Sequence, residues 1–316
     1  MRFSNTLLAA AALLFPALVG ASPLSGLKHK FGQVVVVGDS LSDNGNVYRF
    51  TNHTWPADPA YYKGRFSNGP VWVEYLARDI GPHAGGAPLI DLAYGGATVN
   101  NTRIQGYTGP NSTIPVPSVL DQISAYLKTA KAGEVHSSLF VVTGGANDAF
   151  FGLGGAYSPS KLAKLVAADL ITAAHRLYKA GARHFLIPSP PALQTIPYAQ
   201  DFSISSQPSL KGFSDTFVSY LRANAIKVGK EATVTIFDQV KAFDSYISEK
   251  SKRKGWHVKD ACLVGVYGET KTRTLCADPD KFVFWDIYHP TTKTHRYLAR
   301  RALTALHHNA LSEHKH

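Results

Sequence analysis

The sequence lacks three features that would point away from an ordinary globular protein. After the first 21 residues, no apolar run reaches the roughly 20 residues that a membrane-spanning helix needs, so we expect no membrane domain. The basic residues give a formal net charge of +11, but they are scattered and form no stripe interleaved with aromatics, which argues against a nucleic-acid partner. No linker, repeat or low-complexity segment divides the 316 residues. The chain therefore predicts a single domain, which we expect to be a monomer.

The first 21 residues have the pattern of a secretory signal peptide. Arg2 precedes an apolar stretch from Leu7 to Val19, and Val19 and Ala21 stand where signal peptidase prefers small residues. A membrane anchor is the alternative, although the apolar run is short for one. We predict a cleaved signal at residues 1–21, a secreted protein, and one domain over residues 22–316.

Cysteine is scarce, and its pattern agrees with export. Cys262 and Cys276 are the only two cysteines, and their spacing leaves room for one disulfide. Three Asn-X-Thr sequons predict glycosylated surface loops at Asn52, Asn100 and Asn111 if the host is eukaryotic.

Alternating apolar runs and amphipathic stretches indicate an α/β fold. Four consecutive valines, 34–37, are typical of a strand buried on both faces, as in a parallel sheet. Further strands are expected at 89–92, 139–143, 184–187 and 234–237, and helices at 71–80, 118–130, 160–180 and 208–230. The predicted architecture is a three-layer αβα sandwich around a five-stranded parallel sheet, with right-handed crossovers.

Polar residues and glycines follow several of these strands, at the edge where open α/β sheets place their ligands. The first strand runs into Gly-Asp-Ser-Leu-Ser at 38–42, which delivers the Ser40 hydroxyl at a strand end. The next two strands lead to the glycine pair Gly95-Gly96 and to Asn147. Each feature alone is ordinary turn chemistry, but together they make Ser40 a candidate nucleophile.

A candidate base for that serine lies near the C-terminus. Asp286 and His289 are three residues apart, and Pro290 should keep His289 just outside the helix that follows. An aspartate bound to Nδ1 would leave Nε2 free to accept a proton from a serine. A helix N-terminus favours the neutral imidazole whereas the aspartate favours the charged form, and the sequence leaves this competition open.

With these blocks in this order, the chain resembles the SGNH hydrolases, also called the GDSL esterase/lipase family. The resemblance implies a flavodoxin-like strand order and a catalytic triad in which Ser40 is the nucleophile, His289 the base and Asp286 its orienting partner. It further implies an oxyanion hole formed by the N–H groups of Ser40 and Gly96, with Gly95 as an alternative to Gly96, and by the Asn147 amide. The implied chemistry requires no metal and no organic cofactor.

The finer resemblance is to fungal secreted acetylesterases of carbohydrate esterase family sixteen. The segments that carry it are 31–46, 64–72, 93–98 and 285–291. It implies an acetylated oligosaccharide as the substrate, in particular acetylated xylo-oligosaccharides from hemicellulose. Four aromatic residues in the loop after Ser40 suit sugar faces as well as acyl chains: Trp55, Tyr61, Tyr62 and Phe66.

Two other functions are compatible with parts of the sequence. A GDSL lipase or phospholipase that acts on longer acyl esters shares the segment 64–72 and the order of the motifs, but we find no long apolar lid. A carbohydrate-binding protein that has lost catalysis would retain the scaffold, but here all the catalytic residue types are present.

Overall fold

The structure is a computed structural model that describes residues 31–57, 60–81, 86–201, 207–265, 270 and 272–313. The predicted signal peptide, residues 1–21, lies outside these ranges.

Five strands form a central sheet in the order β2-β1-β5-β6-β7, and every neighbouring pair is parallel. The strands are β1 (Gln33–Val37), β2 (Leu89–Asp91), β5 (Ser138–Val142), β6 (His184–Pro188) and β7 (Thr233–Phe237). Only the first two strands exchange places relative to the chain, which is the flavodoxin-like order. The predicted fold class and strand order are thus confirmed.

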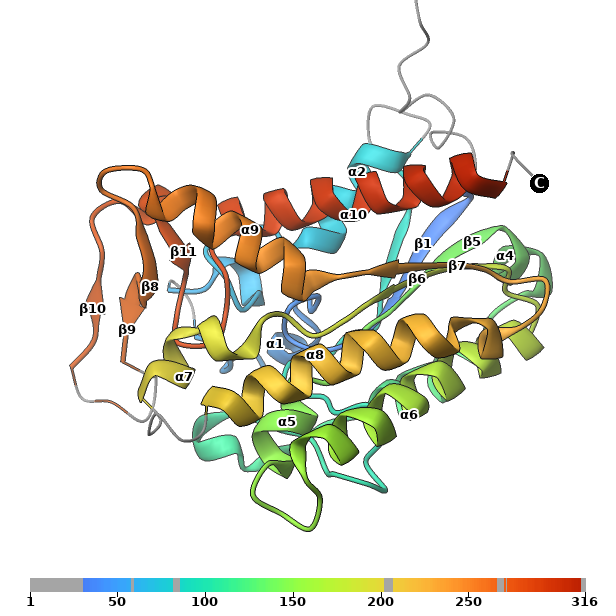
Figure 1. Ribbon diagram of the computed structural model, residues 1–316, viewed down its shortest axis with the longest axis horizontal. Coiled ribbons are helices and arrows are strands. Elements are labelled where there is room, and N and C mark those ends of the chain that lie inside the picture. The colour runs from blue at the N-terminus through green and yellow to red at the C-terminus, as the bar shows by residue number, and fades with distance from the viewer. Residues whose placement is uncertain are drawn as a thin grey trace, which may run out of the picture.

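Helices cover both faces of this sheet. Figure 1 shows α2, α9 and α10 on one side of the strands and α5, α6 and α8 on the other. The α-helices are α1 (Asn46–Phe50), α2 (Trp72–Ile80), α3 (Val119–Leu127), α4 (Ala132–Ser137), α5 (Ala146–Gly152), α6 (Pro159–Lys179), α7 (Pro197–Asp201), α8 (Gln207–Asn224), α9 (Gln239–Ser251) and α10 (Thr292–Glu313). The helix expected over 208–230 ends earlier, because α8 passes into a 3-10 helix at Ala225.

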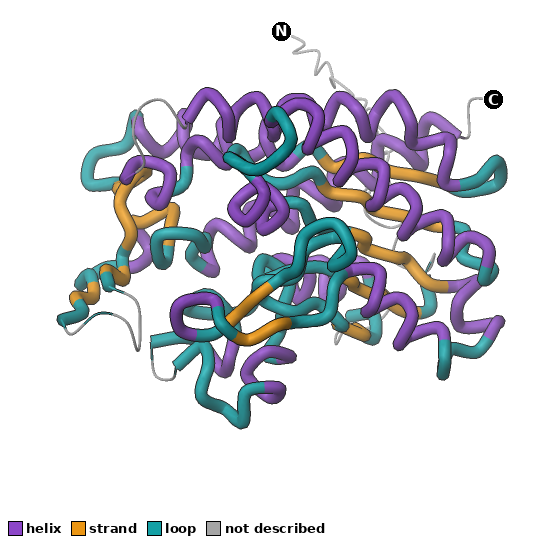
Figure 2. The backbone as a smooth tube through the Cα atoms, turned by 90° about the horizontal axis from the view of Figure 1, so that it is seen from below, coloured by secondary structure: helices purple, strands orange, loops and turns teal. Residues whose placement is uncertain are grey.

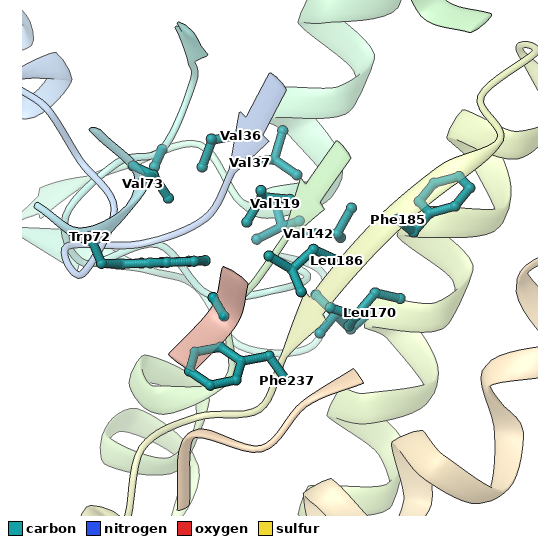
Figure 3. Packing of buried hydrophobic residues seen from close by; sticks show 14 of the residues in the cluster. Val36, Val37, Trp72, Val73, Val119, Val142, Leu170, Phe185, Leu186 and Phe237 are labelled. Carbon is teal, nitrogen blue, oxygen red and sulfur yellow. The ribbon is translucent and has the colours of Figure 1, made fainter. Parts of the chain in front are cut away.

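The core lies between the sheet and its two helical layers. Val34 to Val37 are at most 1% exposed, as expected for a strand that is covered on both faces. Figure 3 shows the Trp72 ring of α2 facing the Phe237 ring at the end of β7, with their centroids 6.1 Å apart. Because these buried contacts surround the carboxyl ends of the strands, they give the loops that leave the sheet a rigid base.

Short elements outside the sheet were not predicted. They are β3 (Tyr107–Thr108), β4 (Ile114–Pro115), β8 (His257–Ala261), β9 (Leu263–Val264), β10 (Thr274–Leu275) and β11 (Phe282–Phe284), and the 3-10 helices η2 (Tyr62–Gly64), η3 (Pro110–Ser112), η4 (Leu193–Thr195), η5 (Ala225–Val228) and η6 (Pro279–Lys281). Figure 2 shows these short strands apart from the main sheet. Strands β9 and β10 are antiparallel, and the predicted disulfide between Cys262 and Cys276 is present beside them.

Candidate active site

Ser40 lies in a turn that is fixed to the end of β1. The main chain of Gly38 is held on both sides by Gln122 of α3: its N–H donates to Oε1 at 2.8 Å, and its carbonyl accepts from Nε2 at 2.9 Å. The buried Asp39 carboxylate accepts the Leu41 N–H at 3.1 Å. These bonds set the backbone on either side of Ser40, whose side chain is partly exposed.

Ser42, the other serine of the turn, has a structural environment. It is completely buried, and its Oγ accepts the Trp72 indole N–H at 3.1 Å. The hydroxyl is therefore engaged with the α2 side of the core, whereas Ser40 faces a cavity.

The structure brings Ser40, His289 and Asp286 together in one hydrogen-bonded row. The Ser40 Oγ lies 2.9 Å from Nε2 of His289, and Nδ1 of the same ring lies 2.8 Å from each carboxylate oxygen of Asp286. This arrangement orients the imidazole so that Nε2 can take the serine proton while Asp286 stabilises the resulting imidazolium.

Local main-chain bonds hold Asp286 in this position. Its Oδ1 accepts the N–H groups of Tyr288 and His289 at 2.8 Å each, and its Oδ2 accepts the Tyr61 hydroxyl at 3.0 Å. Burial by itself would raise the pKa of Asp286, but the charge and the side-chain hydrogen bond of His289, together with the main-chain N–H groups of Tyr288 and His289, outweigh it and hold the pKa below the ordinary 3.8. Asp286 is therefore a stable carboxylate.

His289 lies between β11 and α10, outside any helix, as predicted. The Trp285 N–H donates to the His289 carbonyl at 2.7 Å, which closes a tight loop around Asp286. Helix α10 begins at Thr292, two residues after Pro290.

Gly96 and Asn147 line the same cavity as Ser40. The Asn147 amide donates one bond to the Ala97 carbonyl at 2.9 Å, which fixes the orientation of the side chain. Gly96 has φ +86°, and a Cβ there would collide with the Tyr107 carbonyl. The Gly95 N–H is already engaged with the Asp43 carboxylate at 2.9 Å, and this favours Gly96 as the main-chain donor toward the cavity.

The cavity at Ser40 has a volume of about 220 Å³ and a largely aromatic and aliphatic lining. Of the four loop aromatics singled out in the sequence, Trp55 and Phe66 line it. The Phe66 ring also packs against the His289 imidazole at 5.1 Å between centroids. Tyr61 is instead buried behind Asp286, and Tyr62 is exposed at the surface.

Asp39 and Asp148 are two further buried carboxyl groups. Both lie on the serine side of the cavity, which is the side that carries Ser40 and Asn147. Burial raises the pKa of Asp39 to about 6 and that of Asp148 to about 7. Asp148 follows Asn147 directly, and its carboxylate accepts the Val99 N–H at 3.1 Å. The sequence motif contains both residues, but their burial was not predicted.

The three sequons lie outside the main sheet and the α-helices: Asn52 in a turn, Asn100 in a loop and Asn111 in a short 3-10 helix. Asn52 and Asn111 are exposed, and Asn111 belongs to η3 at the edge of the cavity. Asn100 is half-buried, with its amide 3.4 Å from the Asp169 carboxylate. Attachment of a glycan stays a prediction at all three positions.

The described parts of the chain show neither a metal-binding cluster nor a membrane-spanning helix. Within them, no three histidine, cysteine or acidic side chains are grouped so that they could hold a metal ion. Among the helices of these same ranges, none combines the length and apolarity needed to cross a bilayer.

Comparison with known proteins gives consistent matches. The family described as GDSL-like Lipase/Acylhydrolase matches residues 34–302. The chain is 30% identical over 302 residues to the thermolabile hemolysin of Vibrio parahaemolyticus, covering 90% of this chain and 66% of the hemolysin. It is 26% identical over 316 residues to the phosphatidylcholine-sterol acyltransferase of Aeromonas hydrophila, covering 87% and 90%. One similar solved structure is an acetyl-xylooligosaccharide esterase from Geobacillus Stearmophilus, with 14% identity, a TM-score of 0.47, and 88% and 96% coverage.

Proposed function

The chain belongs to the GDSL-like lipase/acylhydrolase family and is a carboxylic ester hydrolase, and we propose that it is a secreted, monomeric acetylesterase acting on acetylated carbohydrates. Acetylated xylo-oligosaccharides from hemicellulose are the proposed substrates. The observation that carries the proposal is the row from Ser40 through His289 to Asp286, which opens onto a small cavity.

In the proposed mechanism, Ser40 Oγ attacks the ester carbonyl while Nε2 of His289 takes its proton. Asp286 stabilises the imidazolium through Nδ1. The charge that develops on the carbonyl oxygen is met by the N–H groups of Ser40 and Gly96 and by the Asn147 amide. His289 then gives this proton to the departing sugar oxygen, which leaves as a hydroxyl. In the second half, His289 takes a proton from a water molecule that attacks the acyl-enzyme, and returns it to Ser40 Oγ as acetate is released.

The size of the cavity supports a short acyl group. About 220 Å³ is below the roughly 300–1,000 Å³ typical of pockets for drug-sized ligands, so a long acyl chain would have to lie outside it. Trp55, Phe66 and Tyr107 offer flat faces of the kind on which sugar rings pack. An acetyl group together with one sugar residue fits this combination of small volume and aromatic lining.

A second candidate is hydrolysis of longer acyl esters, as by a lipase or phospholipase. Part of the lining is aliphatic, from Pro191, Leu193 and Ile196. One relative of similar length is named as a phosphatidylcholine-sterol acyltransferase. Both observations favour a lipid ester over a sugar ester.

Two measurements separate these candidates. The first is acetate release from defined acetylated xylo-oligosaccharides, with mapping of the sugar positions that remain acetylated. The second compares p-nitrophenyl acetate, butyrate and palmitate, for which we expect activity to fall steeply with chain length. A preference for palmitate, with no acetate released from the sugars, would overturn the acetylesterase proposal in favour of the lipid ester.

Secretion is tested on the protein expressed in its own host. The proposal expects the mature protein in the medium to begin at Ser22, because residues 1–21 would be removed. Retention of Met1 on a protein held in the cells would contradict it.

A further inference from the structure

Tyr61 places a hydroxyl against the carboxylate that orients the proposed base. The tyrosine lies in the loop between α1 and α2, 225 residues before Asp286 in the chain. Its O–H donates to Oδ2 of Asp286 at 3.0 Å, and its side chain lies in the interior, with 8% of the residue exposed.

The ring of Tyr61 is held by residues on the base side of the active site, which is the side that carries Asp286 and His289. It belongs to a buried cluster with Cys262, Leu263 and Trp285, and its centroid lies 6.4 Å from that of the Trp285 ring. The Leu263 N–H donates to the Trp285 carbonyl at 2.6 Å, so the same cluster is connected to the main chain just before Asp286. The packing of the ring against this cluster therefore helps to hold the hydroxyl against the carboxylate.

The two oxygens of Asp286 are held in different ways. Oδ1 accepts two main-chain N–H groups from its own loop, but Oδ2 accepts the Tyr61 hydroxyl from a distant part of the chain. Burial, together with the charge of Asp286, raises the pKa of Tyr61 well above 10. The phenol therefore remains a donor throughout the working range of an esterase, and its bond fixes how the carboxylate plane meets the His289 ring.

We propose that Tyr61 is a positioning residue, whose hydroxyl orients the Asp286 carboxylate toward His289 and shares its negative charge. The inference rests on the proposed triad. It predicts an effect on the chemical step and on its pH dependence, and none on substrate binding, because Tyr61 does not line the cavity.

The test is Tyr61→Phe, which removes a single oxygen atom and keeps the ring. With p-nitrophenyl acetate, kcat should fall about 3- to 10-fold while KM stays unchanged. The acidic limb of the kcat/KM profile should move to higher pH by about half a unit. Without the phenol, the Asp286 carboxylate keeps more of its negative charge and therefore holds a proton on the His289 imidazole more strongly. The other titratable groups that act on this network remain in the variant: Asp39, Arg273 and the buried His295, whose pKa is lowered to about 3 by burial.

Tyr62→Phe is the matched control, since Tyr62 is the next residue and is exposed. It should behave like the wild type. If Tyr61→Phe also matches the wild type in kcat and in the acidic limb, or changes only KM, the proposal is wrong. The pH at which the acidic limb falls does not depend on the amount of folded enzyme. Partial misfolding of the variant therefore cannot imitate a shift of that limb.

A double mutant tests whether Tyr61 acts through Asp286. In an Asp286→Asn background, Tyr61→Phe should add no further loss of kcat, whereas multiplicative losses would contradict the proposed route. Ser40→Ala separates this inference from the proposed function. If Ser40→Ala stays active, the proposed triad itself fails. If it is inactive while Tyr61→Phe is normal, only the role of Tyr61 fails.

Discussion

Buried carboxyl groups on the two sides of the active site have opposite pKa shifts. On the serine side, burial raises the pKa of Asp39 to about 6 and that of Asp148 to about 7. On the base side, Asp286 is also buried, yet its pKa is lowered, because His289 and two main-chain N–H groups outweigh the loss of solvation. Burial alone therefore does not decide the direction of the pKa shift of an aspartate, because the charge of a neighbouring imidazole can outweigh it.

The two sides also differ in how they are built. The serine side is attached directly to the central sheet, through the Gly38–Gln122 bonds at the end of β1. The base side lies on short strands outside the main sheet. There, β11 pairs with β8, and Cys262 of the disulfide is the residue that follows β8 in the chain. We expect the serine side to be rigid because of the sheet, and the base side to depend on local bonds and on the disulfide.

The largest effect that we expect from a change beside the serine is that of Asn147→Ala. If the amide stabilises the oxyanion, its loss should lower kcat about 10²- to 10³-fold with little change in KM. Steady-state kinetics with p-nitrophenyl acetate measure this. Asn224→Ala, which removes an amide that is bonded only within its own helical region, is the control and should leave kcat unchanged. A change in KM with an unchanged kcat would rule out the oxyanion role of Asn147.

Asp148→Asn tests the contrast in charge state. The pKa of Asp148 is about 7 in the folded protein and ordinarily 3.8, so between these values the folded state holds a proton that the unfolded chain has lost. The stabilisation from that proton is complete below about pH 4 and is lost as the pH rises through about 7. It amounts to on the order of 4 kcal/mol. The advantage of the variant over the wild type should therefore grow between pH 4 and pH 8 in thermal melts, and a difference independent of pH would contradict it.

Replacing both cysteines, Cys262→Ser and Cys276→Ser, sharpens the structural contrast. A disulfide that closes a loop of this length stabilises a protein by about 3 kcal/mol. Because the Cys262 N–H also donates to the Phe284 carbonyl, we expect activity to be lost at a lower temperature than the helical signal, as the base side loosens first. Activity and circular dichroism are followed over the same temperature range. If the melting temperature and the activity are both untouched, neither role of the disulfide stands.

The sequence predicts the parts of the molecule that depend on local patterns. Four adjacent valines identify β1, and the other four strands of the sheet follow from alternating apolar and amphipathic segments, whereas the strand order was implied by the family resemblance. Ser40, Asp286 and His289 could be selected because each lies in a short motif, and the structure places them in contact.

What could not be predicted depends on contacts between distant segments. Tyr61 is one of four loop aromatics that suit sugar faces as well as acyl chains, and nothing near it in the sequence indicates that it packs against Trp285 and Asp286. The family resemblance already favours Gly96 over Gly95, but the contact that supports this choice, from the Gly95 N–H to the Asp43 carboxylate, joins distant segments and is visible only in the structure. Strands β8 to β11 are two to five residues long and are stabilised by their neighbours and the disulfide rather than by an apolar pattern of their own.

The central claim is tested most directly by comparing Ser40→Ala with Ser42→Ala. The two serines are two residues apart, but only Ser40 lies against His289, whereas Ser42 is bonded to Trp72 inside the core. Hydrolysis of p-nitrophenyl acetate is measured for both variants and the wild type, with folding checked by circular dichroism. We predict that Ser40→Ala is folded and inactive, while folded Ser42→Ala retains activity. A folded Ser40→Ala protein as active as the wild type would contradict the account.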